Sequence, residues 1–381
     1  MRIDLVITEL ETGGAEKCCA ELAFFLARRG HRVRVIAFGQ RPLSPKDSLA
    51  QSLESNQIEL HFLGGKTWWM LPKVLSRIRS LLRLDQPDVV QSFLWHANVL
   101  AAWVVPSIRV PLFCGVRISE RRANRFALDR WSTSRSTKTV CVSQGVADWC
   151  IQTEKVDASK LIVIPNGIRI ESPSESPCES IVLNSHTVPS NARILLFVGR
   201  LEPQKGIDVM AQYATSLLTS LPDHHLVFIG EGFMRPLVES LSKQKECSGR
   251  VHVLGQRNDV RAWMARSELL LLPARFEGMP NVVLEAMAEG LAVVTTRVEG
   301  IDELLGENLV QQSVAKESWN DFFELVASLA NSPAQQKVLG KANRDRAMAE
   351  FDLEKQLNQY ETLYLAGASH GTLERRSAPQ V

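Results

Sequence analysis

Short apolar runs alternate with amphipathic stretches along the first half of the chain. Residues 2–8 predict a short buried strand, and residues 32–38 predict a second one. Between them, residues 15–29 place most of their apolar side chains on one side of a helix, and Gly30 stands where a C-cap glycine belongs. This strand–helix–strand order indicates a parallel sheet. Further strands are predicted over residues 88–93, 112–116, 138–143 and 161–164.

The same pattern resumes in the second half, after a segment rich in Ser and Pro at residues 171–190 that we interpret as a linker. Residues 334–366 have a helical pattern, and residues 367–381 predict a flexible tail. We therefore expect two α/β domains, over residues 1–170 and 191–350. The strands predicted in the second domain are 193–199, 225–230, 251–254, 268–272 and 291–295.

Composition and charge narrow the class of protein. With 381 residues, 45% of them hydrophobic and 23% charged, the chain has enough apolar material for sizeable cores. The net charge of +2 gives no reason to expect nucleic acid as a partner. The seven cysteines are odd in number and include no Cys-x2-Cys pair, so we expect reduced thiols in a cytosolic protein. No signal peptide is expected, and the longest apolar run, residues 99–105, is too short to span a membrane.

The segment FEGMPNVVLEAMAEG, residues 276–290, carries the strongest chemical signal. Pro280 suits the first turn of a helix, where a missing N–H costs little. The N–H groups of Gly278, Met279 and Asn281 then face whatever lies before the helix. Such an end attracts negative or oxygen-rich groups.

Two glutamates belong to the same segment. Glu277 lies in the loop before the helix, and Glu285 lies inside the helix among apolar neighbours. A carboxylate in that position is costly unless it accepts strong hydrogen bonds, which the vicinal hydroxyls of a ribose would supply. The structural alternative is that Glu285 caps the helix or bridges to a buried arginine.

A second signal is VGRLEPQKG, residues 198–206. A strand ends at Gly199, Arg200 and Lys205 follow in a loop, and a helix begins near Ile207. Two cations at the carboxyl end of a strand, beside a helix N-terminus, are suited to clamp a diphosphate. Two solvated loop cations are the alternative.

A third signal is TGGAEK, residues 12–17. Gly13 and Gly14 allow the backbone to approach a phosphate or a sugar closely at the start of the first helix. The segment is not the G-x-G-x-x-G pattern of dinucleotide-binding proteins, and a plain tight turn is the alternative.

These segments and IPNG (residues 164–167), in their order along the chain, resemble glycosyltransferase family 4. Members of this family are retaining, nucleotide-sugar-dependent enzymes with the GT-B fold. The resemblance implies two Rossmann-like, doubly wound parallel-sheet domains that face each other across a cleft. It also implies a donor site mainly on the second domain, an acceptor site mainly on the first, and a last helix, about residues 351–366, that returns to the first domain.

The resemblance implies a role for each matched residue. Arg200 and Lys205 hold the donor diphosphate and stabilise the leaving group. Glu277 and the N–H groups from Gly278 to Asn281, on either side of Pro280, contact the donor sugar, and Glu285 binds the ribose. The remaining implied donor contacts are Gly13 and Gly14 at the phosphate, and Gly230, Gly255 and Arg257 beside the base.

The first domain departs from the family pattern. Many members carry a histidine after the strand that matches residues 112–116, and Arg117 stands about there in this chain. Arg117 can still grip a phosphate or an acidic acceptor. His96, after the preceding strand, is the other acceptor-side candidate, although a lone histidine beside Trp95 is more often a packing or surface residue.

Two features suggest a lipid surface as a partner. Arginines are frequent between residues 117 and 135. Trp68 and Trp69 form an apolar cluster in the sequence. Both are candidates for contact with an anionic membrane or a polyprenyl diphosphate acceptor. A solvated helix face and ordinary core packing are the alternatives. The expected location is the cytoplasm, with peripheral contact at the inner face of the plasma membrane.

The leading hypothesis is a retaining hexosyltransferase that uses a nucleoside diphosphate sugar, with UDP favoured. The expected acceptor belongs to polysaccharide, lipopolysaccharide or lipid-linked glycan biosynthesis. No metal or other cofactor is expected, because the chain has no Asp-x-Asp triplet and two cations with helix ends can neutralise the diphosphate. The alternatives are a nucleotide-sugar 2-epimerase of the same fold and a non-catalytic nucleotide-sugar-binding subunit.

Overall fold

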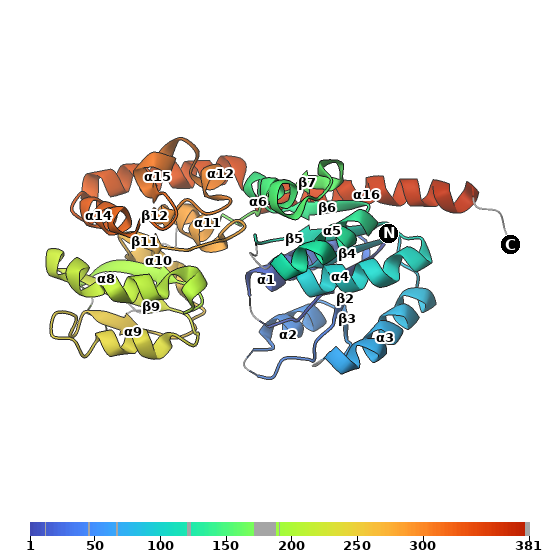
Figure 1. Cartoon of the computed structure of the whole chain (residues 1–381), viewed down its shortest axis with the longest axis horizontal. Coiled ribbons are helices and arrows are strands. Elements are labelled where there is room, and N and C mark those ends of the chain that lie inside the picture. The colour runs from blue at the N-terminus through green and yellow to red at the C-terminus, as the bar shows by residue number, and fades with distance from the viewer. Residues whose placement is uncertain are drawn as a thin grey trace. The chain divides into compact units, whose positions relative to one another are not determined.

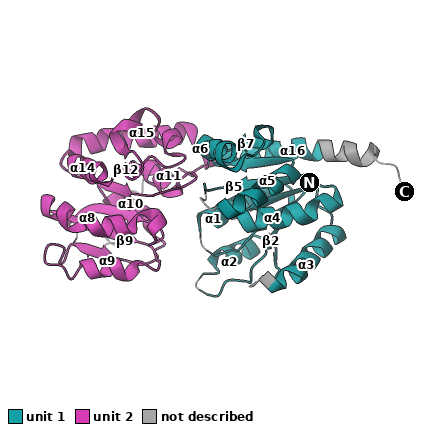
Figure 2. Ribbon diagram, viewed as in Figure 1, with its two compact units in different colours: residues 1–165, 354–381 teal, residues 166–353 magenta. Residues whose placement is uncertain are grey.

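The chain folds into two compact units in a computed structural model (Figures 1 and 2). The first unit comprises residues 1–165 and 354–381, and the second comprises residues 166–353. The residues that the structure describes are 1–11, 13–44, 46–65, 68–119, 123–170, 188–189 and 191–377.

The first unit is built on a seven-stranded parallel sheet with the order β3-β2-β1-β4-β5-β6-β7. The chain order reverses between β1 and β4, where Ile3 pairs with Val33 of β2 on one side and with Val89 of β4 on the other. Such a reversal is the usual ligand position in an open α/β sheet. The strands are β1 (Arg2–Ile7), β2 (Arg32–Ala37), β3 (Glu59–Phe62), β4 (Val89–Phe93), β5 (Leu112–Val116), β6 (Lys138–Cys141) and β7 (Leu161–Val163).

Helices pack against this sheet through apolar stripes. In α3 the residues Val74, Ile78 and Leu82 recur at helical spacing and are buried against the β-strand core that contains Val6 and Val90. The helices of the first unit are α1 (Gly14–Arg28), α2 (Ser48–Ser55), α3 (Leu71–Leu84), α4 (Trp95–Val104), α5 (Phe126–Arg135), α6 (Gln144–Trp149) and most of α16 (Leu353–Ser377).

The last helix, α16, is fastened to the first unit by buried aromatic residues. The Tyr364 hydroxyl donates to Gln91 Oε1 of β4 at 3.1 Å, and its ring lies 5.4 Å from the ring of Phe113 in β5. Just before this helix, Asp352 forms a parallel bridge with Ile168, so the two connections between the units run side by side.

The second unit has a six-stranded parallel sheet with the order β10-β9-β8-β11-β12-β13. Its core joins Phe197 and Phe228 of the central strands to Met210 of α8 and Phe322 of α14. The strands are β8 (Arg193–Val198), β9 (His224–Ile229), β10 (Val251–Val253), β11 (Leu269–Leu272), β12 (Ala292–Thr296) and β13 (Ser313–Val314). The helices are α8 (Ile207–Ser220), α9 (Arg235–Leu241), α10 (Val260–Arg266), α11 (Asn281–Ala288), α12 (Ile301–Leu305), α13 (Leu309–Gln312), α14 (Trp319–Ala330) and α15 (Pro333–Glu350).

Two doubly wound parallel sheets confirm the predicted fold class. The pattern missed β3, whose residues are all half-buried, and β13, which has only two residues. Residues 367–377, which fall in the predicted flexible tail, continue helix α16, which ends at Ser377. The second unit already begins at Asn166, and the predicted linker lies almost wholly outside the described residues.

Two general expectations can be compared with the described residues. No helix among them is long and apolar enough to cross a membrane. Six cysteines are described, and all six are free thiols. Residues 99–105 fall in α4 and the short 3-10 turn after it, so they are part of the first unit's core and surface.

Candidate active site

Glycines bring the loops at the carboxyl edge of the second sheet into direct backbone contact. Gly199 donates its N–H to Ile229 O at 3.0 Å, and Gly230 donates to Gly255 O at 2.8 Å. A Cβ atom on Gly230 would lie only 2.0 Å from Gly199 O, and φ at Gly230 is +138°. Only glycine fits such a position. The loops after β8, β9 and β10 therefore form one continuous edge.

The loops after β8 and β11 are joined in the same way. A Cβ on Gly206 would lie 2.0 Å from Pro273 O, and Arg275 N–H donates to Gln204 O at 2.9 Å. The Arg275 guanidinium also forms two hydrogen bonds, of 2.8 and 2.6 Å, with the carboxylate of Asp208 in the first turn of α8. A bidentate pair of this kind fixes geometry as well as charge. These contacts hold the predicted clamp loop against the predicted sugar-contact loop.

Lys205 and Glu277 meet across these two loops. Lys205 Nζ lies 2.5 Å from Glu277 Oε1, and the two side chains are only 14% and 11% exposed. An ion pair this far removed from water is costly to desolvate, and removing one partner leaves an uncompensated charge. The structure thus brings together the two residues predicted as catalytic that come from different loops.

Arg200, the third residue predicted as catalytic, lies on the surface. Its side chain is 61% exposed, pairs with Glu202 at 2.9 Å and donates to Gln204 Oε1 at 2.7 Å. Gln204 in turn donates to Phe276 O at 3.2 Å. Arg200 is therefore attached to the same pair of loops as Lys205, with a guanidinium that water and an anion can reach.

The segment 277–281 leads into α11 as predicted. Pro280 is the N-cap residue of α11, and Asn281 is its first helical residue. Gly278 contacts the next loop, since a Cβ on Gly300 would lie 2.6 Å from Gly278 O. Met279 is buried at 4% exposure. The helix N-terminus thus lies at the sheet edge beside the Lys205 loop.

Asn166 is a residue of this region whose role sequence analysis did not assign. It is buried, its amide Nδ2 donates to Met279 O at 3.1 Å and to Asn281 Oδ1 at 2.7 Å, and its N–H contacts Met279 Sδ at 3.2 Å. It therefore fixes the entry to α11. The signal was present, because Asn166 belongs to the IPNG segment.

The other residues predicted to contact the donor lie at different places in the second unit. Glu285 is half-buried in α11, next to Leu284 and Ala286 that are fully buried. Gly230 and Gly255 lie at the sheet edge. The Arg257 guanidinium forms two 2.6 Å hydrogen bonds with Asp259.

In the first unit, Gly13 and Gly14 do begin α1, but a carboxylate occupies their surroundings. A Cβ on Gly13 would lie 2.2 Å from Glu16 Oε2, and Glu16 is buried at 8% exposure. A glutamate at the third helical position that folds back over the N-cap is the acidic half of a capping box. The carboxylate of Glu16 thus lies against the N-terminus of α1.

Arg117 follows β5 and turns inward. Its guanidinium donates to Cys18 Sγ of α1 at 3.1 Å. Arg117 also lies near Tyr360 of α16, where burial raises the pKa of the Tyr360 hydroxyl to about 12 against the opposing effect of the Arg117 charge. Arg117 therefore joins α1, β5 and α16, and it is not part of an exposed arginine face.

His96 lies at the end of the neighbouring strand. It is exposed in the first turn of α4 and packs edge-on against Trp95, with ring centroids 4.9 Å apart. Leu94, which connects β4 to this helix, has φ +72° and ψ +158°, a conformation that costs a non-glycine residue about 1–3 kcal/mol. Arg125 lies 4.3 Å above the Trp95 ring. The backbone here is held in a strained turn that presents Trp95 and His96 at the sheet edge.

The described residues include no cluster of metal-ligating side chains. Within the described ranges, no three His, Cys, Asp or Glu side chains lie close enough to hold a metal ion. The positive charges near the second sheet edge come from side chains, Lys205 and Arg200.

Known proteins match the chain in both halves. The model of "Glycosyltransferase Family 4" matches residues 12–172, and the model of "Glycosyl transferases group 1" matches residues 181–346. The chain is 24% identical over 311 residues to an Escherichia coli enzyme, UDP-Gal:alpha-D-GlcNAc-diphosphoundecaprenol alpha-1,3-galactosyltransferase. This match covers 77% of the chain and 79% of the relative.

Solved structures match over nearly the whole length. Anabaena HepE in complex with UDP-glucose superposes with a TM-score of 0.81 at 20% identity, covering 95% of this chain and 99% of that one. WaaG, a glycosyltransferase involved in lipopolysaccharide biosynthesis, superposes with a TM-score of 0.72 at 20% identity, covering 96% and 99%. At this identity the superpositions show the fold, which is GT-B.

Proposed function

Because the chain belongs to glycosyltransferase family 4, we propose that it transfers a sugar from a nucleoside diphosphate sugar to a hydroxyl of a glycan acceptor, with retention at the anomeric carbon. The observation that carries this proposal is the buried Lys205–Glu277 pair, held by two interlocked loops beside the N-terminus of α11. Catalysis of this transfer mainly requires positive charge placed where the diphosphate departs.

The residues of the second unit fit the charge changes of such a step. The bond from the sugar's anomeric carbon to the diphosphate oxygen breaks, and its electron pair leaves with the nucleoside diphosphate. The acceptor oxygen bonds to the same carbon, and its proton passes to the departing phosphate oxygen. Lys205 and Arg200 supply the charge that stabilises that oxygen, and no protein base is needed on the acceptor side.

Glu277 has two roles in this proposal. It holds Lys205 at 2.5 Å, and it accepts hydrogen bonds from the donor sugar when the diphosphate attracts Lys205. The N–H groups at the start of α11 favour an anionic or oxygen-rich group for the same electrostatic reason. Glu285, half-buried one turn further along α11, accepts from the ribose hydroxyls.

UDP is the donor nucleotide that we propose. The E. coli relative is named for UDP-galactose, and the Anabaena structure contains UDP-glucose. The same E. coli relative acts on a diphosphoundecaprenol-linked sugar, and WaaG acts in lipopolysaccharide biosynthesis. An acceptor in lipid-linked glycan or surface polysaccharide synthesis is therefore the favoured class.

A test of the donor is thermal stabilisation of the full chain by UDP, GDP, UDP-glucose, UDP-galactose and UDP-N-acetylglucosamine. We expect a selective upward shift in Tm with UDP compounds, lost in Arg200→Ala and retained in Arg28→Ala, a matched exposed arginine at the end of α1. No shift with any of these compounds, or an unchanged shift in Arg200→Ala, would contradict the proposal. Release of UDP together with an epimerised sugar, in the absence of any acceptor, would indicate the epimerase alternative.

We also propose a peripheral contact with an anionic membrane, on α3 rather than on the arginines after β5. Residues 68–84 include four cationic side chains and no acidic one, and Lys73 and Arg83 are exposed. Trp69 is 66% exposed and Leu71 39% exposed at the start of the same helix. A basic amphipathic helix with an exposed tryptophan is typical of a membrane interface.

Co-sedimentation with vesicles tests this contact. We expect binding to phosphatidylglycerol-containing vesicles and not to pure phosphatidylcholine, with binding lost in a Lys73→Glu/Arg83→Glu variant. The matched control is Lys341→Glu, an exposed lysine of α15 in the second unit. Equal binding of the α3 variant and the wild type would contradict this assignment.

A further inference from the structure

The turn that follows β12 packs directly on the loop that carries Glu277. A Cβ atom on Gly300 would lie 2.6 Å from Gly278 O and 2.8 Å from Met279 Cα, and φ at Gly300 is +80°. Only glycine fits such a position. Glu299, the residue before this glycine, is therefore held beside the loop by the backbone.

The Glu299 carboxylate divides its two oxygens between a cation and this loop. Oε1 accepts from Lys316 Nζ at 2.7 Å, and Oε2 accepts from the backbone N–H of Glu277 at 3.5 Å. The side chain of Glu299 is only 10% exposed, and that of Lys316 is 30% exposed. Little water therefore competes for the carboxylate, and its charge strengthens the longer of the two contacts.

Lys316 lies in the loop after β13, and hydrogen bonds fix the start of that loop against the turn with Glu299. Arg297 N–H donates to Val314 O at 2.8 Å, and Arg297 Nε donates to Ser313 Oγ at 3.1 Å. The ion pair between Lys316 and Glu299 therefore joins two loops that the backbone already holds together.

Asn166 holds the other end of the Glu277 loop. Its amide donates to Met279 O and to Asn281 Oδ1, where the loop enters α11. The five residues 277–281 are thus fastened at both ends, by an amide at the helix and by the Glu299 carboxylate at Glu277. A loop held in this way carries its side chains in a fixed geometry, as a preorganised site requires.

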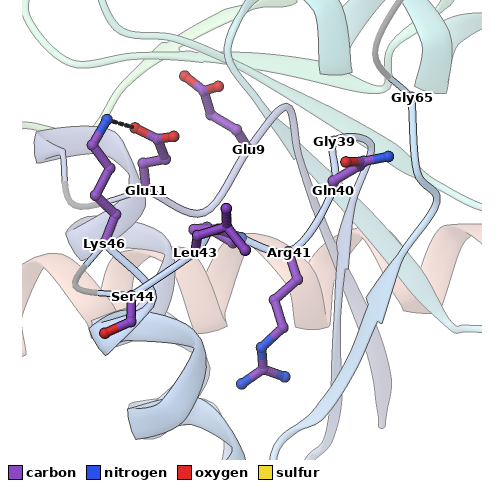
Figure 3. Close-up of a pocket in the computed structure, with 10 residues that line it drawn as sticks. Glu9, Glu11, Gly39, Gln40, Arg41, Leu43, Ser44, Lys46 and Gly65 are labelled. Atoms are coloured by element: carbon purple, nitrogen blue, oxygen red, sulfur yellow. Dashed lines mark hydrogen bonds and ion pairs between the residues drawn. The ribbon is translucent and has the colours of Figure 1, made fainter.

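The first unit has an exposed counterpart of this ion pair. Lys46 and Glu11 pair at 2.8 Å and line a cavity of about 480 Å³ between the loops after β1, β2 and β3, together with Glu9 (Figure 3). Their side chains are 58% and 48% exposed. Water screens such a pair, and it fixes little. The Glu299 carboxylate differs because it is shielded from water and has a backbone N–H as its second partner.

We infer that Glu299 is a positioning residue for the sugar half of the donor site. By accepting from the Glu277 N–H, it holds the Glu277 side chain where it meets Lys205 and, in the proposed reaction, the donor sugar. Lys316 fixes one oxygen of Glu299 and so directs the other at this N–H. This inference rests on the proposed glycosyltransferase function, and it adds to the site a residue from outside the two loops that sequence analysis singled out.

Two double variants of the full chain separate positioning from charge balance. Glu299→Gln/Lys316→Met and Glu299→Leu/Lys316→Met both remove the ion pair and carry side chains of similar size. Only the first keeps an oxygen that can accept from the Glu277 N–H. Each is titrated in a calorimeter with UDP and with the compound, among UDP-glucose, UDP-galactose and UDP-N-acetylglucosamine, that stabilises the wild type most.

We expect the glutamine double variant to bind UDP and the UDP-sugar within about twofold of the wild type. The leucine double variant should bind UDP equally well but the UDP-sugar about tenfold more weakly, because Glu277 then no longer meets the sugar. Glu11→Leu/Lys46→Met, which removes the exposed pair of the first unit, is the matched control and should bind both ligands like the wild type. Equal affinities of the two Glu299 variants for the UDP-sugar, or a parallel loss of UDP binding, would overturn the inference.

Hydrogen exchange of the Glu277 amide checks the contact without any ligand. This amide should exchange faster in the leucine double variant than in the glutamine one, and equal rates would overturn the inference while the donor proposal stands. A wild type that binds neither UDP nor any of the three UDP-sugars would contradict the proposed function, and the assignment of Glu299 to a donor site would fall with it.

Discussion

The carboxyl edges of the two sheets have the same architecture and carry different charged side chains. At the edge of the second unit, Lys205 and Arg200 each meet one glutamate beside the N-terminus of α11. At the edge of the first unit, the cations are also paired, but Glu9 remains as an additional carboxylate. The same doubly wound fold therefore carries a different set of charged side chains at the edge of each sheet.

The helix N-termini at the two edges also differ in the charged side chains that lie beside them. The start of α11 lies beside the Lys205 loop, with a proline at its N-cap and no side-chain cap. The start of α1 has the buried carboxylate of Glu16 against Gly13. An anion is stabilised electrostatically at the N-terminus of α11, whereas the Glu16 carboxylate repels it at the N-terminus of α1. Chemistry thus follows from a few charged side chains rather than from the fold.

The largest effect on activity is expected from removing one partner of the buried ion pair at the edge of the second sheet. Lys205→Ala should lower turnover about a hundredfold or more, because it removes leaving-group stabilisation and leaves Glu277 as an uncompensated carboxylate. The measurement is the steady-state rate of UDP release with donor and acceptor. The matched control is Lys341→Ala on α15, and a normal rate for Lys205→Ala would show that the clamp lies elsewhere.

The next largest effect is on stability, and it tests the close packing of the loops at the carboxyl edge of the second sheet. Gly230→Ala should cost about 2 kcal/mol more of unfolding free energy than Gly249→Ala, measured by urea denaturation. Both glycines have positive φ, but a Cβ on Gly230 would lie 2.0 Å from Gly199 O, whereas nothing lies within 4 Å of a Cβ on Gly249. Equal losses for the two variants would mean that the loops are not in contact.

Glu285 tests whether the second edge recognises the whole nucleotide. Glu285→Gln should weaken UDP-sugar binding about tenfold in calorimetry, because an amide cannot accept from both ribose hydroxyls as a carboxylate does. Glu289→Gln, at the C-cap of the same helix and paired with Arg261, is the control. Unchanged affinity of Glu285→Gln for the UDP-sugar would show that Glu285 does not bind the ribose hydroxyls.

The smallest effect is a pH dependence confined to the second unit. Burial, and then the charge of His225, lower the pKa of His252 to about 4, and the two rings are stacked with Nδ1 and Nε2 2.9 Å apart. The unfolded chain takes up a proton near pH 6.5 and the folded chain does not. Stability is therefore constant above about pH 7 and falls between pH 6.5 and 4.

We expect this loss to be about 1 kcal/mol, since β10 is an edge strand and His225 is only half-buried. Protection factors of the amides in β9 and β10, each taken relative to the intrinsic exchange rate at pH 7 or pH 5, measure this loss, and His252→Gln should abolish it. A lower protection factor at pH 5 in the variant as well as in the wild type would contradict the assignment.

The sequence alone predicted the sheets and the second edge because both depend on local patterns. Buried parallel strands are continuous apolar runs, and Arg200, Lys205 and Glu277 lie in loops directly after such runs. What it could not predict is pairing across the sheet. The Lys205–Glu277 contact joins positions 72 residues apart, and Asn166 joins α11 from a still more distant segment.

The first edge was predicted less well for the same reason. Arg117 stays an acceptor-side candidate, and its guanidinium contact with Cys18 of α1 joins positions 99 residues apart, which no local pattern indicates. The cavity around Glu9 is formed by three loops that are separate in sequence, so no single motif indicates it.

Hydrogen-exchange mass spectrometry with and without UDP tests the division between the two edges most directly. With UDP bound, we expect slower exchange in residues 199–206 and 273–285 of the second unit, and unchanged exchange in residues 9–11 and 39–46 of the first. Protection by UDP in the loops around Glu9, with no change around Lys205, would contradict it.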